Sequence, residues 1–314
     1  MITCKSPRTV LLEAYQLAGE CLPDYSCKHS RHDFTLPQLF ACLVLREHQK
    51  ESYRGIVAML NDSPQWCAEI GLRKVPAHNT LCAAFGAVTK GTHVKSMLDL
   101  SAEWMKKGKE LGKDIGIDST LKDGRYLSRH YEQRCRHMAE KDRKSTNKKR
   151  SKSAKRTPKL ALAVDARSHL ILAHRTRIGM GSDAPDFEPL LRMALSRHPR
   201  IKCVLADAGY DSHHNHCVAR EELGVRSLIK VGCGRPTTKP LTSKYRRRMQ
   251  RELAGSQTAK PYGQRAQAET VNSMIKRNLG DHLRSRSTKR RKREMSLRVV
   301  VHNIMLLATV KSRV

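Results

Sequence analysis

The sequence predicts an α/β protein in which a mixed sheet with flanking helices follows an all-helical region. Three observations favour this fold class. Residues 1–110 show apolar spacing of helical period, short apolar runs of strand character begin at Asp114, and helices alternate with strands after the third run. We therefore divide the chain into a helical domain, 1–110, and an α/β domain, 111–314.

The helical domain contains at least three helices. Apolar residues recur at helical spacing in three segments, 36–45, 53–60 and 81–88. Residues 75–81 can open the second helix of a helix-turn-helix, with Asn79 or Thr80 near its N-cap. A plain helical packing domain explains the same pattern almost as well, so both interpretations stay open.

The α/β domain is expected to contain five strands. These are 115–117, 160–164, 170–174, 203–206 and 225–231. The second and third form a hairpin around 165–168. Helices are expected at 186–197, 212–223, 261–280 and 297–310.

The helix expected at 261–280 carries the most informative pattern. Tyr262, Arg265, Glu269 and Lys276 have the spacing Tyr-x2-Arg-x3-Glu-x6-Lys. At roughly 100° per residue, these side chains and Asn272 fall within an arc of about 80°. One carboxylate among two cations, a phenol and an amide suits an acid that holds a metal while its neighbours hold phosphate. The simpler alternative is a solvated helix face with an Arg265–Glu269 pair.

The charge of the chain points to nucleic acid. Its 314 residues include 61 basic and 29 acidic ones, for a formal charge of +32, and such an excess favours a polyanionic partner. Aromatic residues are only 4%, which favours a duplex held by its backbone over stacked bases. A membrane surface is the main alternative, but no apolar run reaches the roughly 18 residues of a transmembrane helix, and Glu13 and Glu20 argue against a signal peptide. We expect a soluble, cytoplasmic, nucleoid-associated protein.

Two basic tracts, 124–160 and 284–293, interrupt the α/β domain. Such tracts are usually mobile without a partner, and a solvated segment is the simplest interpretation. Beside a candidate phosphate site they are better interpreted as DNA-contacting loops.

The ten cysteines are scattered without a Cys-x2-Cys pair. Two groups contain enough ligands for a zinc ion: Cys21, Cys27, His29 and His32, and His213, His214, His216 and Cys217. Neither has the usual spacing of a structural zinc site. Reduced, mostly buried thiols are the simpler interpretation.

Two acids directly follow apolar strands. Asp118 comes after Ile117, and Asp207 comes after Ala206. A buried strand end is a costly place for an unpaired charge unless a metal compensates it, and phosphoryl transfer by two divalent ions needs several carboxylates at one point. We expect Asp118, Asp207 and Glu269 to converge. Other acids have simpler roles: Asp165 in the hairpin turn, although it is the chief rival, and Asp186 and either Asp211 or Ser212 as helix caps.

These residues resemble the insertion-sequence transposases of bacteria and archaea that carry an Asp-Asp-Glu triad on a ribonuclease-H-like fold. The resemblance lies in the blocks 117–120 and 206–211 and in the spacing of Tyr262, Arg265, Glu269 and Lys276, which is the signature of one subgroup. It spans most of 110–310. Members with a large β insertion after the last strand use it on DNA; this chain has only a basic connection there, which includes 244–248.

The resemblance implies a function and a set of site residues. Asp118, Asp207 and Glu269 would hold two Mg²⁺ ions, for which Mn²⁺ would substitute. Tyr262, Arg265 and Lys276 would grip phosphates of the transposon end, and Asn272 on the same face is assigned to DNA binding with them. Water would attack each end, and the freed 3′-hydroxyl would then attack target DNA. Partners would be double-stranded terminal inverted repeats and target DNA, with a homodimer at work.

Other functions stay open. A related nuclease that cuts without joining would use the same triad. A captured transposase kept as a DNA-binding regulator is disfavoured because the triad is intact. A nucleoid-type or ribosomal basic protein would explain the charge of the chain but not the three acids.

Overall fold

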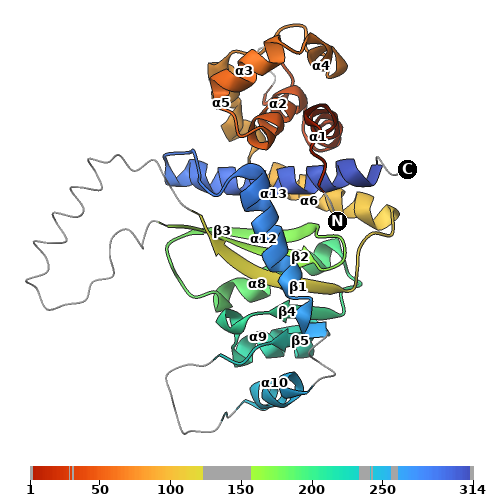
Figure 1. Cartoon of the computed structure of the whole chain (residues 1–314), viewed down its shortest axis with the longest axis vertical. Helices are drawn as coiled ribbons and strands as arrows, with labels where there is room; N and C mark the ends of the chain where they lie inside the picture. Colours follow the sequence, from red (N-terminus) through yellow and green to blue (C-terminus); the bar gives the residue numbers. More distant parts are fainter. Residues whose placement is uncertain are drawn as a thin grey trace, which may run out of the picture.

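The computed structural model describes residues 3–27, 29, 32–122, 157–232, 241, 243–255 and 261–311. A group of helices lies above a single sheet, and a long C-terminal helix runs between them (Figure 1). None of the helices in these ranges is long and apolar enough to cross a membrane.

One sheet of five strands forms the centre of the α/β part. The strands are β1 (Asp114–Leu121), β2 (Pro158–Asp165), β3 (Ile171–Ile178), β4 (Cys203–Ala206) and β5 (Arg226–Ile229). Their order is β3-β2-β1-β4-β5, with β1 antiparallel to β2 and parallel to β4. The predicted fold class, a ribonuclease-H-like mixed sheet with a helical N-terminal region, is confirmed. Strand β1 is longer than expected because the polar residues 118–120 interrupt its apolar run without ending its ladder to β2.

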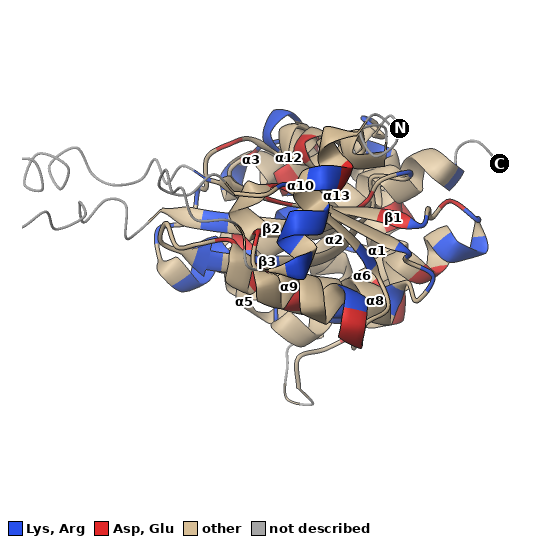
Figure 2. Ribbon diagram, turned by 90° about the horizontal axis from the view of Figure 1, so that it is seen from below, with Lys and Arg blue, Asp and Glu red and all other residues tan. Residues whose placement is uncertain are grey.

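The helices are α1 (Pro7–Cys21), α2 (Leu36–His48), α3 (Tyr53–Asn61), α4 (Pro64–Glu69), α5 (His78–Val88), α6 (Gly91–Lys107), α8 (Ala184–Arg197), α9 (His213–Cys217), α10 (Lys244–Ala254), α12 (Ala266–Leu279) and α13 (Thr288–Lys311), with short turns at Ala208–Tyr210 and Val218–Glu222. The N-cap of α5 is Ala77, without a side-chain bond, and Asn79 and Thr80 lie just after it in the first turn. Helix α10 was not expected. It presents Lys and Arg residues at its surface (Figure 2).

Helices cover both faces of the sheet. The apolar side of α8 packs through Phe187 and Leu190 against Ala161 and Ala163 of β2. The opposite face of β2 carries Leu160 and Leu162, which belong to a cluster shared with α12 and α13. Alternation of side chains along a strand produces this division.

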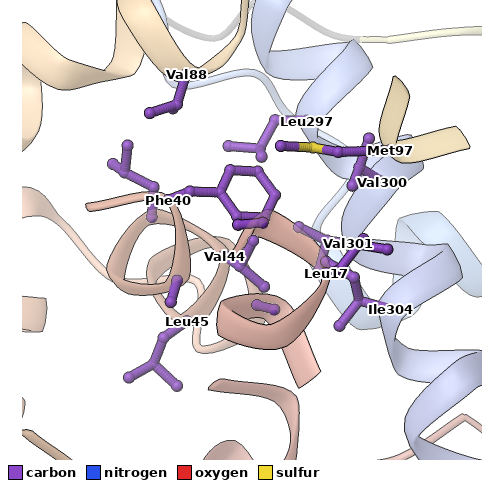
Figure 3. Close-up of a cluster of buried hydrophobic side chains, with 14 of the residues drawn as sticks. Leu17, Phe40, Val44, Leu45, Val88, Met97, Leu297, Val300, Val301 and Ile304 are labelled. Atoms are coloured by element: carbon purple, nitrogen blue, oxygen red, sulfur yellow. The ribbon is translucent and has the colours of Figure 1, made fainter. Parts of the chain in front are cut away.

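The N-terminal helices and α13 share one hydrophobic core. Phe40 of α2 and Leu17 of α1 lie beside Leu297, Val301 and Ile304 of α13 (Figure 3). These side chains are at most 1% exposed, so α1 and α2 bury part of their apolar surface against a helix from the far end of the sequence. This burial stabilises both parts together.

A buried ionic cluster fastens the same interface. Glu47 of α2 is fully buried and contacts Arg46, Arg284 and Arg298, the last through Nε at 3.2 Å. Arg298 also donates to the carbonyls of Gly280 and His282, both at 2.7 Å, in the turn that follows α12. One guanidinium therefore joins α2, α13 and the end of α12.

The prediction of a basic loop over 284–293 is wrong for residues 288–293, which are helical. Residues from Thr288 onward begin α13, whose buried face starts at Arg291, only 7% exposed, and continues through Glu294 and Met295. Arg284 bonds Glu47, and Arg293 donates to the carbonyl of Gly86 at 2.7 Å. Of the other basic tract, 124–156 lies outside the described residues.

Candidate active site

The register of β1 and β4 brings Asp118 and Asp207 side by side. The two strands are parallel, and Ile117 pairs with Ala206, so the next residue of each strand is an aspartate. Neighbouring strands lie about 4.8 Å apart, which places both acids at one edge of the sheet. Asp207 directly follows β4, and its Oδ1 accepts from the amide of Gly209 at 2.9 Å.

Strand β1 and helix α12 fit together in steps. A methyl group placed on Gly116 would lie 3.0 Å from Cβ of Ala268, so the glycine allows the close approach of the helix. Two residues further along β1, Oδ2 of Asp118 accepts a 2.9 Å bond from Nδ2 of Asn272, four residues further along α12. Two strand residues span about 6.6 Å and four helix residues about 6.0 Å. The two distances nearly match, so a second contact can form where the first pair has already met.

Glu269 shares a pocket with Asp118. The pocket has a volume of about 310 Å³ and is lined by Asp118, Ser119, Thr120, Glu269, Asn272, Ser273 and Lys276. Glu269 is exposed and forms a 2.6 Å ion pair with Nη1 of Arg265, one helical turn earlier. The carboxylate is therefore neutralised by its own helix.

Asp118 is the electrostatic centre of the pocket. Burial raises the pKa of its carboxyl, the amide of Asn272 lowers it, and the nearby carboxylates of Asp207 and Glu269 raise it again. The structure thus brings Asp207 and Glu269 within electrostatic reach of Asp118. Such repulsion favours either a proton or a cation at Asp118.

The oxygen atoms at this site are of the types that bind divalent cations. Carboxylate and amide oxygens are preferred ligands of Mg²⁺, and Oδ1 of Asn272 is buried with no hydrogen-bond partner in the described chain. Their present positions are not yet those of ligands. Within the described ranges, no three His, Cys, Asp or Glu side chains lie close enough to hold one ion.

Among the described residues, neither candidate zinc group brings three ligands together. His213 and Cys217 touch, with Nε2 and Sγ 3.5 Å apart, but His216 turns to Ser227 and His213 to Ser243. In the other group, His32 stacks on Tyr25 at 4.0 Å between ring centroids.

The four residues of the spaced pattern occupy two segments. Helix α12 begins at Ala266, and Tyr262 lies in a separate helical turn before it, joined by bonds such as that from the amide of Arg265 to the carbonyl of Tyr262. The prediction of one continuous helix is wrong at this point, because these bonds span three residues, as in a 3₁₀ turn, and Gly263 favours no single conformation. Gly280 ends α12 with φ of 88°, as expected for a C-terminal glycine.

The side chains around the acids differ in what they contact. The hydroxyl of Tyr262 donates to the carbonyl of Ala206 at 3.2 Å, and Arg265 lies 5.9 Å from its ring. Lys276 is exposed at the pocket wall. Asn272 is only 6% exposed and faces Asp118, so the structure places it against the acid and not at the exposed surface.

The remaining acids fall away from the pocket or pair with cations. Asp165 accepts from the amide and hydroxyl of Ser168 in the hairpin turn, and it pairs with Ile115 at the opposite end of β1 from Asp118. Asp186 does not cap α8 as expected; it is buried in the first turn beside Arg175 and Arg177. Ser212 caps α9, accepting from the amide of Asn215 at 3.0 Å.

Asp183 is a neighbour of the site that the sequence did not reveal. A Cβ on Gly209 would lie 3.1 Å from Oδ1 of Asp207 and 3.3 Å from Oδ2 of Asp183, so the two carboxylates flank this glycine. Asp183 also accepts from the hydroxyl of Ser119 at 2.7 Å and pairs with Lys159. Its position before Ala184-Pro185 indicates only a helix start, and no sequence signal links it to Asp207.

The chain matches a model of a known protein family. Residues 115–304, more than half of the 314-residue chain, match the family model described as Transposase DDE domain. The matched range runs from the start of β1 through α12 and into α13, and it includes Asp118, Asp207 and Glu269. No curated protein matches the chain.

Proposed function

Because the chain belongs to the Transposase DDE domain family, we propose that it cuts DNA at the ends of an insertion sequence and joins the freed ends to target DNA. The observation that carries the proposal is the pairing of Ile117 with Ala206, after which an aspartate follows in each segment, while the first of these, Asp118, shares a pocket with Glu269. Members of this family use divalent metal ions.

We assign Asp118, Asp207 and Glu269 as the residues that would hold two Mg²⁺ ions, with Mn²⁺ as a substitute. Bound there, divalent ions would activate the attacking oxygen and stabilise the leaving one. Asn272 would orient Asp118 through its amide, and Arg265, once released from Glu269, would be free to bind phosphate. Lys276 at the pocket wall would bind phosphate as well.

We propose the order of reaction that the resemblance to these transposases implies. Water would first attack the phosphodiester at each transposon end, leaving a 3′-hydroxyl. That hydroxyl would then attack a phosphodiester of the target. The spacing of Tyr262, Arg265, Glu269 and Lys276 supports membership of the Tyr-Arg-Glu-Lys subgroup, in which these side chains serve the transposon end.

The domains and the assembly complete the proposal. We propose that residues 1–110 form a helical domain that binds the terminal inverted repeats and that 111–314 form the catalytic domain. Their basic residues contribute to the formal charge of +32, which favours a duplex as partner. Holding two DNA ends at once would require a homodimer.

The test is metal-dependent cleavage of a duplex that carries the transposon end. Asp118→Asn, Asp207→Asn and Glu269→Gln should each lower the cleavage rate by about a thousandfold or more while duplex binding survives. Asp62→Asn is the matched control, because Asp62 is an exposed acid outside the pocket. Cleavage at the wild-type rate in all three site variants would refute the assignment.

A further inference from the structure

Lys122 continues the strand face that carries Asp118. Its backbone amide donates to the carbonyl of Pro158 at 2.9 Å, so the ladder between β1 and β2 still holds it. Side chains alternate along a strand, and Gly116, Asp118, Thr120 and Lys122 therefore share one face. Because Gly116 and Asp118 meet α12, Lys122 is directed to the same side.

The side chain of Lys122 is buried without a partner. It is 1% exposed, and its Nζ has no hydrogen-bond partner in the part of the chain that the structure describes. The charged groups around it are Arg298 of α13, Lys276 of α12 and Asp281 of the following turn. Two of these three carry the same sign as the lysine.

This environment disfavours a charged amine in the free protein. Burial, first of all, and the positive charges of Arg298 and Lys276 lower the pKa of Lys122 to about 7, against the opposing effect of Asp281. A buried ammonium without a partner destabilises the fold. Residues kept at such a cost are frequently functional.

The missing partner is therefore an anion. Thr120 and Lys276 line the pocket, and Lys122 is the next residue on that strand face. We propose that Lys122 and Lys276 form a phosphate-binding site at the end of the pocket towards α13, and that it takes a backbone phosphate of the DNA strand held at Asp118. This inference rests on the proposed function for its choice of DNA.

Geometry separates this phosphate from the one that would be cut. Four strand residues span about 13 Å, so the backbones of Asp118 and Lys122 lie well apart. The phosphate bound at Lys122 is thus a different phosphate of the same DNA strand from the one that would be cut at Asp118. The four-carbon stem of lysine lets its ammonium move towards Lys276 without a change in the strand.

The first experiment measures binding of an end-bearing duplex in metal-free buffer, where no cleavage occurs. Lys122→Met should lower the affinity about tenfold and reduce the salt slope by about one, as expected for one lost phosphate contact. The same variant should melt at a higher temperature, because an unpartnered buried amine has been removed. Lys113→Met is the matched control; Lys113 is exposed at the other end of β1 and should affect neither quantity.

A second measurement needs only the wild type. Duplex binding should take up a proton at Lys122, so affinity should fall as pH rises from 6 through the pKa of about 7 to 8.5. An affinity that does not change over this range would overturn the proposal, and so would Lys122→Met with wild-type affinity and salt slope. Inorganic pyrophosphate is the competing probe: Lys122-dependent binding of pyrophosphate without any effect on the duplex would assign the site to free phosphate compounds and overturn the choice of DNA.

The outcomes also separate this inference from the proposed function. Lys122-dependent duplex binding by a wild type that never cleaves would support the phosphate site and refute the enzyme. Metal-dependent cleavage with unchanged duplex binding in Lys122→Met would support the enzyme and refute the phosphate site.

Discussion

The side-chain amide of Asn272 donates a 2.9 Å hydrogen bond to Oδ2 of Asp118 and so joins the central strand of the sheet to the helix that bears Glu269. The positions of Asp118 and Asn272 are fixed by the close approach of their backbones. Gly116, two residues before Asp118, lies against Ala268, four residues before Asn272. The position of the helix along the strand is thus fixed at the point where the acids lie. Contacts between strand and helix, more than loop structure, determine the shape of this site.

Asn272→Leu should shift the pH dependence of cleavage. The amide lowers the pKa of Asp118, so its removal raises that pKa, and the ionised carboxylate forms only at higher pH. The acidic limb of the pH–rate profile should therefore move to higher pH. Ser273→Ala, at the exposed wall of the same pocket, is the control. An unmoved acidic limb in Asn272→Leu would show that the amide does not tune Asp118.

Gly116→Val should push α12 away from β1. The added side chain meets Cβ of Ala268, and overpacking of this kind costs about 1–3 kcal/mol in the free energy of unfolding. Urea unfolding measures the loss, and cleavage should fall with it. Gly19→Ala provides the contrast: no atom lies within 4 Å of the new methyl group, and alanine favours a helix interior by up to about 1 kcal/mol.

Glu47→Gln should destabilise the protein by about 3 kcal/mol or more at neutral pH, because it leaves Arg298 and Arg284 buried around a neutral amide. Burial raises the pKa of Glu47, but Arg298, Arg284 and Arg46 outweigh it and hold the pKa below its ordinary value of 4.5. A carboxyl with a lowered pKa contributes stability above its unfolded pKa and loses it as pH falls through the folded one.

The difference in unfolding free energy between wild type and Glu47→Gln should therefore narrow below about pH 4.5. Glu69→Gln is the control, since Glu69 pairs with Arg8 at the surface and should leave stability unchanged. If this difference in unfolding free energy stayed constant down to pH 3, the charge of Glu47 would not be what stabilises the interface.

Asp211→Asn should loosen α10. The buried carboxylate of Asp211 accepts from Nε of Arg246 at 2.9 Å and from the amide of Gly232 at 2.8 Å, and so fastens the helix to the loop after β4. Loss of the charge should raise hydrogen exchange across 244–254 about tenfold, while β1 stays protected. Glu221 is an exposed acid that pairs with Lys244 and accepts from the hydroxyl of Tyr245; Glu221→Gln removes its charge but can still accept that bond, so the exchange should stay unchanged.

The sequence predicted the parts of the site that follow from periodicity. Apolar runs that end in an acid identified Asp118 and Asp207, and the register of β1 and β4 brings these residues together. The same rule raised Asp165 as a rival. It fails there because β2 is antiparallel to β1, so its end lies at the opposite edge of the sheet. Strand direction cannot be read from a single apolar run.

Other contacts depend on tertiary structure that no local pattern encodes. Asp183 reaches Asp207 only because the loop before α8 passes Gly209. The basic residues of 284–293 suggested a loop, although Arg284 pairs with an acid 237 positions earlier. The sequence gives the number of basic residues that could contact DNA, but only the fold shows which of them, such as Arg284, pair with groups inside the protein.

The place of α13 in the chain affects how the protein is made. Leu297, Val301 and Ile304 complete the core that Leu17 and Phe40 bury, yet they are translated after every other described element. The first helices therefore emerge from the ribosome with an uncovered apolar side and must wait for most of the message to be read. A product of premature termination before Thr288 would leave that side permanently exposed and become a substrate for proteolysis.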